Sequence, residues 1–181
     1  MKKVRLPALW VNEVKPTSVI GYLITYDLYD DMFACTKRLF TPFPEEHLYA
    51  GFIEEQFLAS YDEVLELITN AIVSSHDLEE EEVEEKVKRI VDRMQEKTRE
   101  FINEAEKEAK EDGYNSLIPD AFDDGAYGFQ PMICNVNRIL TGDKALYPAL
   151  SMPNTGYYEI PDIEEDCSFL SDLLSNSSLQ K

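Results

Sequence analysis

The segment from Asp77 to Asp112 constrains the fold more than any other part of this chain. Its apolar residues recur at three- and four-residue steps, a period that predicts one amphipathic helix. At 1.5 Å per residue this helix would be on the order of 50 Å long. Gly113 follows directly, and glycine commonly ends a helix because it adopts the left-handed conformation without strain. The stripe comprises Val83, Val87, Ile90, Val91, Met94, Thr98, Phe101, Ile102 and Ala105.

A helix with so long an apolar face needs a partner surface of similar length. The near-heptad spacing fits a coiled-coil contact with a second copy of the chain. Packing over a sheet and a shorter helix of the same chain is the simpler interpretation. The sequence leaves both arrangements open.

The residues before and after this helix predict a small, mostly antiparallel sheet. β-Branched and aromatic residues concentrate in three early segments, which are separated by turn-forming residues. Shorter segments of the same kind follow Gly113. The expected strands cover residues 5–11, 19–26, 32–40, 126–134, 136–140 and 156–160.

A shorter helix is predicted between the early strands and the long helix. Ser60 and Glu63 form a capping box, in which each side chain accepts a hydrogen bond from a backbone N–H at the helix start. Apolar spacing carries this helix to about Val73. The segment 44–59 is ambiguous, because a proline followed by two acids suits a first helical turn, whereas Gly51 and the aromatic residues also suit a strand. We expect a helix there.

These elements predict an α+β fold in which residues 1–160 form a single domain. The domain contains a small, mostly antiparallel sheet, a short helix and one long helix over about 77–112. Residues 161–181 form an acidic tail that contains the pattern Phe-Leu-x-x-Leu-Leu. Such a tail either docks as a terminal helix or stays mobile and folds on a partner.

The net charge is −19, and much of it lies in one block. No lysine or arginine occurs between Arg38 and Lys86, and the 47 intervening residues hold fourteen Asp and Glu residues. Binding to DNA, RNA or anionic lipid requires clustered cations, so the charge argues against these ligands and points to a basic protein as partner. The candidate partner-binding residues are Glu45, Glu46, Glu54, Glu55, Asp62, Glu63, Glu66, Glu79, Glu80 and Glu81.

Part of this acidic block has a structural explanation that needs no partner. Acids at a helix start are stabilised by about 0.3–1 kcal/mol each through the helix dipole, which accounts for residues 79–81. Glu82, Glu84 and Glu85 can pair with the cations four residues later. In the remaining segment, 45–66, seven carboxylates accompany aromatic residues and no cation lies nearby in sequence. We expect the binding face there.

No catalytic motif is present, and we expect neither a catalytic residue nor a cofactor. The sequence lacks the glycine-rich phosphate loops, the nucleophile elbow and the zinc-binding HExxH pattern. Two aspartate clusters are the remaining candidates for a divalent metal, although neither has calcium-loop spacing and aspartate also stabilises tight turns through its own backbone. The clusters are Asp27, Asp30 and Asp31, and Asp120, Asp123 and Asp124.

The histidines and cysteines add no clear site. His47 and His76 both lie in the acidic block, but no motif connects them with a nucleophile. Cys35, Cys134 and Cys167 are odd in number and lack CxxC spacing, which predicts reduced thiols. The N-terminus reads as mature protein, and no run of about 18 apolar residues predicts a membrane span. We therefore expect a cytoplasmic protein.

One known class of proteins carries carboxylates in a similar pattern. Here they are Glu45, Glu46, Glu54, Glu55, Asp62, Glu63, Glu66 and residues 79–82. With its small size and its lack of catalytic motifs, the chain resembles small phage-type inhibitors of bacterial defence nucleases, the anti-restriction and anti-CRISPR class, some of which imitate nucleic acid. The resemblance is one of charge pattern, and no family motif is matched. It implies an inhibitor, in the host cytoplasm if phage-encoded, that occupies the Lys/Arg channel of a CRISPR or restriction nuclease.

Two other functions remain open. An acidic adaptor or chaperone would form a homodimer through the long helix and dock a partner with its tail. A metal-dependent nuclease or hydrolase would use the aspartate clusters.

Overall fold

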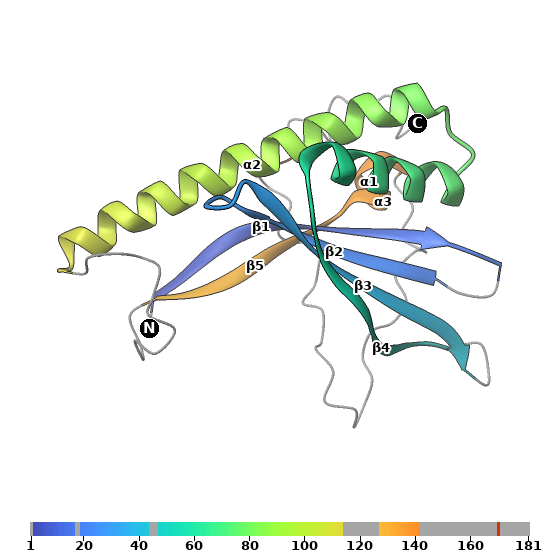
Figure 1. Ribbon diagram of the computed structural model, residues 1–181, viewed down its shortest axis with the longest axis horizontal. Helices are drawn as coiled ribbons and strands as arrows, with labels where there is room; N and C mark the ends of the chain where they lie inside the picture. The colour runs from blue at the N-terminus through green and yellow to red at the C-terminus, as the bar shows by residue number, and fades with distance from the viewer. Residues whose placement is uncertain (1, 17–18, 44–46, 114–126, 142–169, 171–181) are drawn as a thin grey trace.

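The computed structural model describes residues 2–16, 19–43, 47–113, 127–141 and 170 (Figure 1). The expected α+β fold is confirmed. Five strands form one sheet in the order β4-β3-β2-β1-β5, in which neighbours are antiparallel except for the parallel pair β1–β5. The elements are β1 Lys2–Val14, β2 Val19–Asp27, β3 Met32–Phe43, β4 His47–Ala59, α1 Tyr61–Ser75, α2 Glu80–Glu111, β5 Tyr127–Asn135 and α3 Val136–Thr141.

The two longer helices lie together on one side of the sheet, and α2 runs along much of its length (Figure 1). Side chains alternate across the strands, so Leu9, Ile24 and Phe33 face the helices while their neighbours Leu23 and Ala34 lie on the opposite face. Each large side chain buried in this way contributes about 1.5–3 kcal/mol. The helix residues of the core are Val64, Ile68, Ala71, Ile72, Val83, Val87, Ile90, Val91 and Met94.

The apolar stripe of the long helix packs against other elements of the same chain. Its members from Val83 to Ala105 are buried against the sheet and α1, apart from the half-buried Phe101. This confirms the simpler of the two packing interpretations. The apolar surface on which the homodimer prediction was based is therefore buried within a single chain.

Local signals set the helix ends as expected. The Ser60 hydroxyl accepts a hydrogen bond from the Glu63 N–H at 3.2 Å, and the Glu63 carboxylate accepts one from the Ser60 N–H at 3.1 Å. Gly113 has a φ of +92°, the left-handed conformation that ends α2 without a steric cost for glycine. The predicted capping box and the predicted stop are thus both confirmed.

Two predicted elements are wrong. The segment expected as a helix over 44–59 is instead the edge strand β4, because its backbone pairs with β3 over nearly its whole length. The segment expected as a strand over 136–140 is the short helix α3. The side chain of Asn135, at the end of β5, accepts a hydrogen bond from the Arg138 N–H at 3.2 Å, which is the bond of a helix N-cap.

Little of the predicted tail can be compared with the structure. Residues 156–160 and 161–181 lie outside the described residues, except for Leu170. The Leu170 side chain is completely buried and belongs to the main core cluster. At that residue, the C-terminal segment is docked.

Met94→Ala tests whether the stripe holds one chain together. The truncation leaves a cavity in the core, so the free energy of unfolding in urea should fall by about 2–5 kcal/mol. Asn103→Ala, at an exposed position of the same helix, should change it by less than about 0.5 kcal/mol. If the stripe joined two copies instead, the unfolding midpoint would rise with protein concentration and Met94→Ala would change the sedimentation coefficient.

Candidate acidic interface

The outer face of α1 carries acids that form no ion pair within the part of the chain that the structure describes. Asp62, Glu63 and Glu66 are exposed, and this 15-residue helix contains no basic residue. Among the described residues, none of the ion pairs involves these three side chains. The face results from the helical period, because the apolar residues of α1 occupy the side toward the sheet and leave the acids outside.

One acid of this face also has a structural role. The hydrogen bond from the Ser60 backbone, followed by the bond with the Ser60 side chain, lowers the pKa of Glu63. Glu63 therefore stays ionised in more acidic solution than an ordinary glutamate does. Asp62 and Glu66 make no such bond. Asp62 lies in the first turn of α1, where the helix dipole stabilises an acid, whereas Glu66 lies beyond that turn.

Tyr61 brings a fourth carboxylate to the same place. Its phenol donates a 2.6 Å hydrogen bond to Oδ1 of Asp92, an exposed residue in the middle of α2. Desolvation, then this hydrogen bond, raises the pKa of the Tyr61 phenol. We call Asp62, Glu63, Glu66 and Asp92 the α1 patch. Sequence reasoning missed Asp92 because it lies outside the acidic block.

The acids at the start of α2 form a separate group. Residues 79–82 are exposed and lie at the opposite end of α1, because the two helices run antiparallel. A helix of 15 residues is about 22 Å long, and charges separated by more than about 8 Å are largely screened at physiological ionic strength. Of the three expected i,i+4 pairs, only Glu85–Arg89 brings its atoms within ion-pair distance, at 3.5 Å.

One acid of β4 has a cation opposite it that is distant in sequence. Glu55 is exposed and lies directly opposite Lys37 of β3, so the two side chains share one face of the sheet. The strand register shifts at Glu54, between the pairs Lys37–Glu55 and Arg38–Ile53. Glu45 and Glu46 lie outside the described residues. Within the expected binding face over 45–66, the acids whose side chains are described are Glu55 and those of α1.

The first aspartate cluster is a turn. Oδ1 of Asp27 accepts hydrogen bonds from the N–H groups of Tyr29 at 3.0 Å and Asp30 at 3.3 Å. Asp31 adopts a φ of 52°, which a tight turn requires, and its Oδ1 accepts a 2.5 Å hydrogen bond from the Tyr26 phenol. No group of three potential metal ligands occurs in the part of the chain that the structure describes. The second cluster, Asp120, Asp123 and Asp124, lies outside it.

The histidine within the described residues has a structural role. The backbone N–H of His76 donates to the Ile72 carbonyl at the end of α1. Its ring Nε2 lies 3.3 Å from Nδ2 of Asn137, whose side chain also accepts from the Asn12 N–H at 2.7 Å. This network joins α1, β1 and α3. Of His47, only the backbone is described.

The prediction of three reduced thiols is wrong. Cys134 is disulfide-bonded, and its partner lies outside the described residues. Cys35 is a free thiol, and burial raises its pKa to about 12. So protonated a thiol is a poor nucleophile. The argument from cysteine content for a reducing compartment loses its basis.

Comparisons with known proteins give no family for this chain. No protein-family model matches it, and no curated protein or solved structure does so either. Within the described residues, no helix has both the length and the hydropathy that crossing a bilayer requires.

Two tyrosines predict a loss of stability at high pH. Desolvation, then a hydrogen bond to Glu106, raises the pKa of Tyr29 from 10.0 to about 12, and Tyr61 shifts in the same direction. The folded state therefore favours the neutral phenols. The stabilising effect of Tyr29 is complete below pH 10 and is lost as pH rises through about 12, and that of Tyr61 is lost at still higher pH. The free energy of unfolding should fall less steeply over that range for Tyr29→Phe/Tyr61→Phe than for the wild type. Parallel curves from urea denaturation would contradict this.

Proposed function

We propose that this chain binds a basic surface of a partner protein through the α1 patch, and that it thereby inhibits a nucleic-acid-binding protein such as a CRISPR or restriction nuclease. The supporting observation is the pair Asp62 and Glu66. Both are exposed, and neither forms an ion pair with another described residue. Unpaired carboxylates on one face repel each other, so a cationic partner stabilises them.

Inhibition would act by occupying the cations that otherwise hold phosphates. The α1 patch and residues 79–82 together supply eight carboxylates over a helix about 22 Å long. A DNA duplex presents about thirteen charges over the same length. The lower density favours occlusion of a limited group of lysines and arginines over imitation of a continuous duplex.

The other two functions gain no support from the described residues. The adaptor hypothesis relied on a long apolar stripe, which is buried in the core. The hydrolase hypothesis relied on aspartate clusters, and the described one is tied into a hairpin turn. The acidic face of α1 is the feature that the inhibitor proposal explains.

Asp62→Asn/Glu66→Gln tests this proposal. The tagged wild type should retain a nucleic-acid-binding protein from an extract of its host cell, and the retained protein should release DNA or RNA when this chain binds. The variant should bind that protein about a hundredfold more weakly, because an interfacial charge pair contributes about 1.5 kcal/mol or more and each 1.4 kcal/mol is a factor of ten.

The matched control is Glu104→Gln/Glu111→Gln, which removes the same charge from exposed positions near the other end of α2. It should leave the affinity within about twofold of the wild type. Affinity should also fall steeply as salt rises. The proposal fails if both double variants bind equally well, or if the retained protein keeps its full affinity for nucleic acid.

A further inference from the structure

A second candidate site lies where β1 separates from β2. The last residue pair between these strands is Ala8–Thr25, although β1 begins at Lys2 and β2 continues to Asp27. Pro7 stands directly before that pair and has no N–H with which to extend the ladder. Beyond it, β1 continues beside β5 alone. The separation opens a pocket of about 460 Å³.

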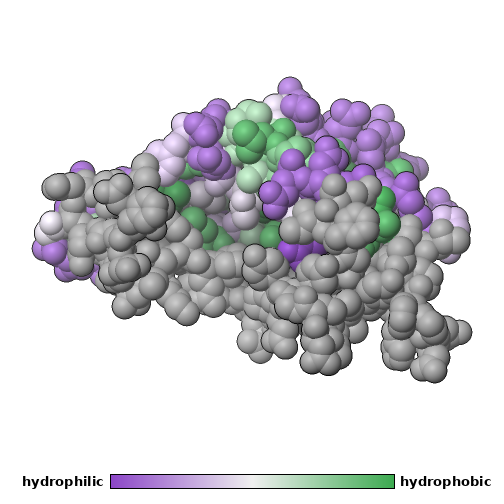
Figure 2. All heavy atoms as spheres, turned by 60° about the horizontal axis from the view of Figure 1, so that its bottom comes forward, coloured by the Kyte–Doolittle hydropathy of each residue, from purple (hydrophilic) through white to green (hydrophobic). Residues whose placement is uncertain are grey.

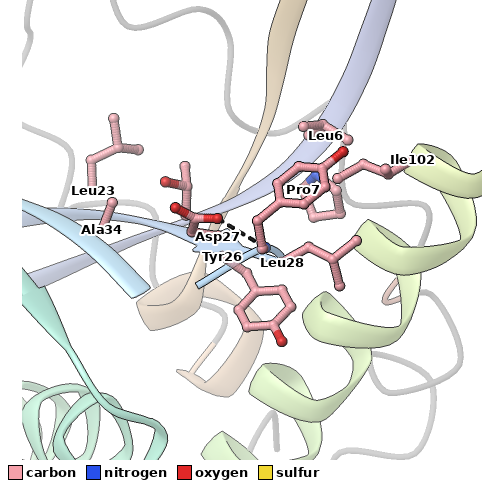
Figure 3. Close-up of a pocket in the computed structure, with 10 residues that line it drawn as sticks. Leu6, Pro7, Leu23, Tyr26, Asp27, Leu28, Ala34 and Ile102 are labelled. Atoms are coloured by element: carbon pink, nitrogen blue, oxygen red, sulfur yellow. Dashed lines mark hydrogen bonds between the residues drawn. The ribbon is translucent and has the colours of Figure 1, made fainter. Parts of the chain in front are cut away.

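The walls of this pocket come from four parts of the fold. Leu6 belongs to β1, Leu23 to β2, Ala34 to β3 and Ile102 to α2 (Figure 3). The side chains of Leu6 and Leu28 also pack against the small core cluster around Ile102. The volume lies within the range of about 300–1,000 Å³ that is typical of ligand sites.

The pocket is rigid at its hairpin end. Oδ1 of Asp27 holds the turn through the two backbone N–H groups of Tyr29 and Asp30. The Tyr29 phenol donates a 2.8 Å hydrogen bond to Glu106, and Arg99 donates to the Tyr26 phenol at 3.2 Å, so the turn is fixed to α2 at two points. A preformed pocket does not have to be ordered when a ligand enters, which favours binding.

The pocket continues into exposed apolar surface. Ala34 is exposed, and its neighbour across the strands, Leu58 of β4, is 59% exposed on the same face of the sheet. Among the described residues, Leu58 and the 55% exposed Tyr29 are the exposed large hydrophobic side chains. On the face drawn in Figure 2, hydrophobic surface lies between hydrophilic stretches. An open strip of this kind suits a peptide better than a small molecule, which a pocket normally encloses.

The charged groups around the pocket restrict which kind of ligand it can bind. Asp27 is the one ionisable wall residue apart from the tyrosines, and none of the ten wall residues is basic. Asp30 is exposed in the same turn, and Glu106 lies beside Tyr29 at the α2 side. Arg99 lies against the Tyr26 ring, with its guanidinium carbon 5.6 Å from the ring centre, and donates to the Tyr26 phenol, which donates to Asp31. The described carboxylates at Asp27, Asp30 and Glu106 favour a cation beside them.

We infer that this pocket binds a segment of a partner protein in which a large apolar side chain stands next to a lysine or arginine. The apolar side chain enters between Leu6, Leu23 and Ile102. The neighbouring cation lies at Asp27 and Glu106. The inference does not rest on the proposed function, because it uses no residue of the α1 patch.

A displayed random peptide library provides the test. Selection on the full chain should yield peptides with a large apolar residue beside Lys or Arg. Their binding should shift the methyl NMR signals of Leu23 and Ile102, and Ala34→Trp should weaken it at least tenfold by filling the mouth of the pocket. Because Ala34 is an exposed strand residue, tryptophan is compatible with the fold there.

Asp27→Asn keeps the carbonyl oxygen that accepts the turn hydrogen bonds but removes the charge. It should weaken the selected peptides about tenfold, whereas Asp62→Asn/Glu66→Gln should leave them unchanged. The inference is overturned if no peptide shifts the Leu23 and Ile102 signals, if the selected peptides lack cations, or if the α1 double variant weakens them as much as Asp27→Asn does. If this inference fails, the proposed function of the α1 patch is unaffected, because the binding assay with Asp62→Asn/Glu66→Gln tests a different surface.

Discussion

The burial of one face of α2 against the sheet and α1 determines most of this structure. Val87, Ile90 and Met94 lie in the core with residues from all five strands. Because α1 packs against both α2 and the sheet, it has one orientation in which its apolar residues are covered. Its acids then point outward. The α1 patch is therefore a consequence of core packing, and its position is as fixed as the core.

Local signals in the sequence were sufficient wherever the cause of a structure is local. The period of the long helix, the Ser60–Glu63 capping box and Gly113 each act within a few residues, and each was predicted correctly. The segment 47–59 has no strong local preference, so its state depends on pairing with β3, which the sequence does not display. The N-cap of α3 is also a local signal, because Asn135 stands directly before the first residue of that helix and could have been recognised there.

The acidic block shows why adjacency in sequence is a poor guide to a surface. Its members divide among an edge strand, the start of α1 and the start of α2, and the acids at the two ends of α1 are separated by more than the distance beyond which salt screens charges. Lys37, distant in sequence, lies opposite Glu55, whereas Asp92, also distant, joins the α1 patch through Tyr61. The position of Lys37 opposite Glu55 follows from strand register, and the position of Asp92 beside Tyr61 follows from helix packing. Neither could be derived from the spacing of charges along the chain.

The two proposed surfaces differ in the physics that would hold a partner. At the α1 patch, attraction comes from exposed charges, so it should be long in range, fast in association and weak at high salt. At the pocket between β1 and β2, apolar burial supplies most of the free energy, and Asp27 and Glu106 orient the cation, so binding there should persist when salt screens the charges. The patch lies on the helix layer, whereas Leu23, Ala34 and Leu58 lie on the opposite face of the sheet. Tyr26 and Ile102 also line the pocket from the helix side. The salt dependence of binding, measured separately at each surface, distinguishes one partner that contacts both from two independent partners.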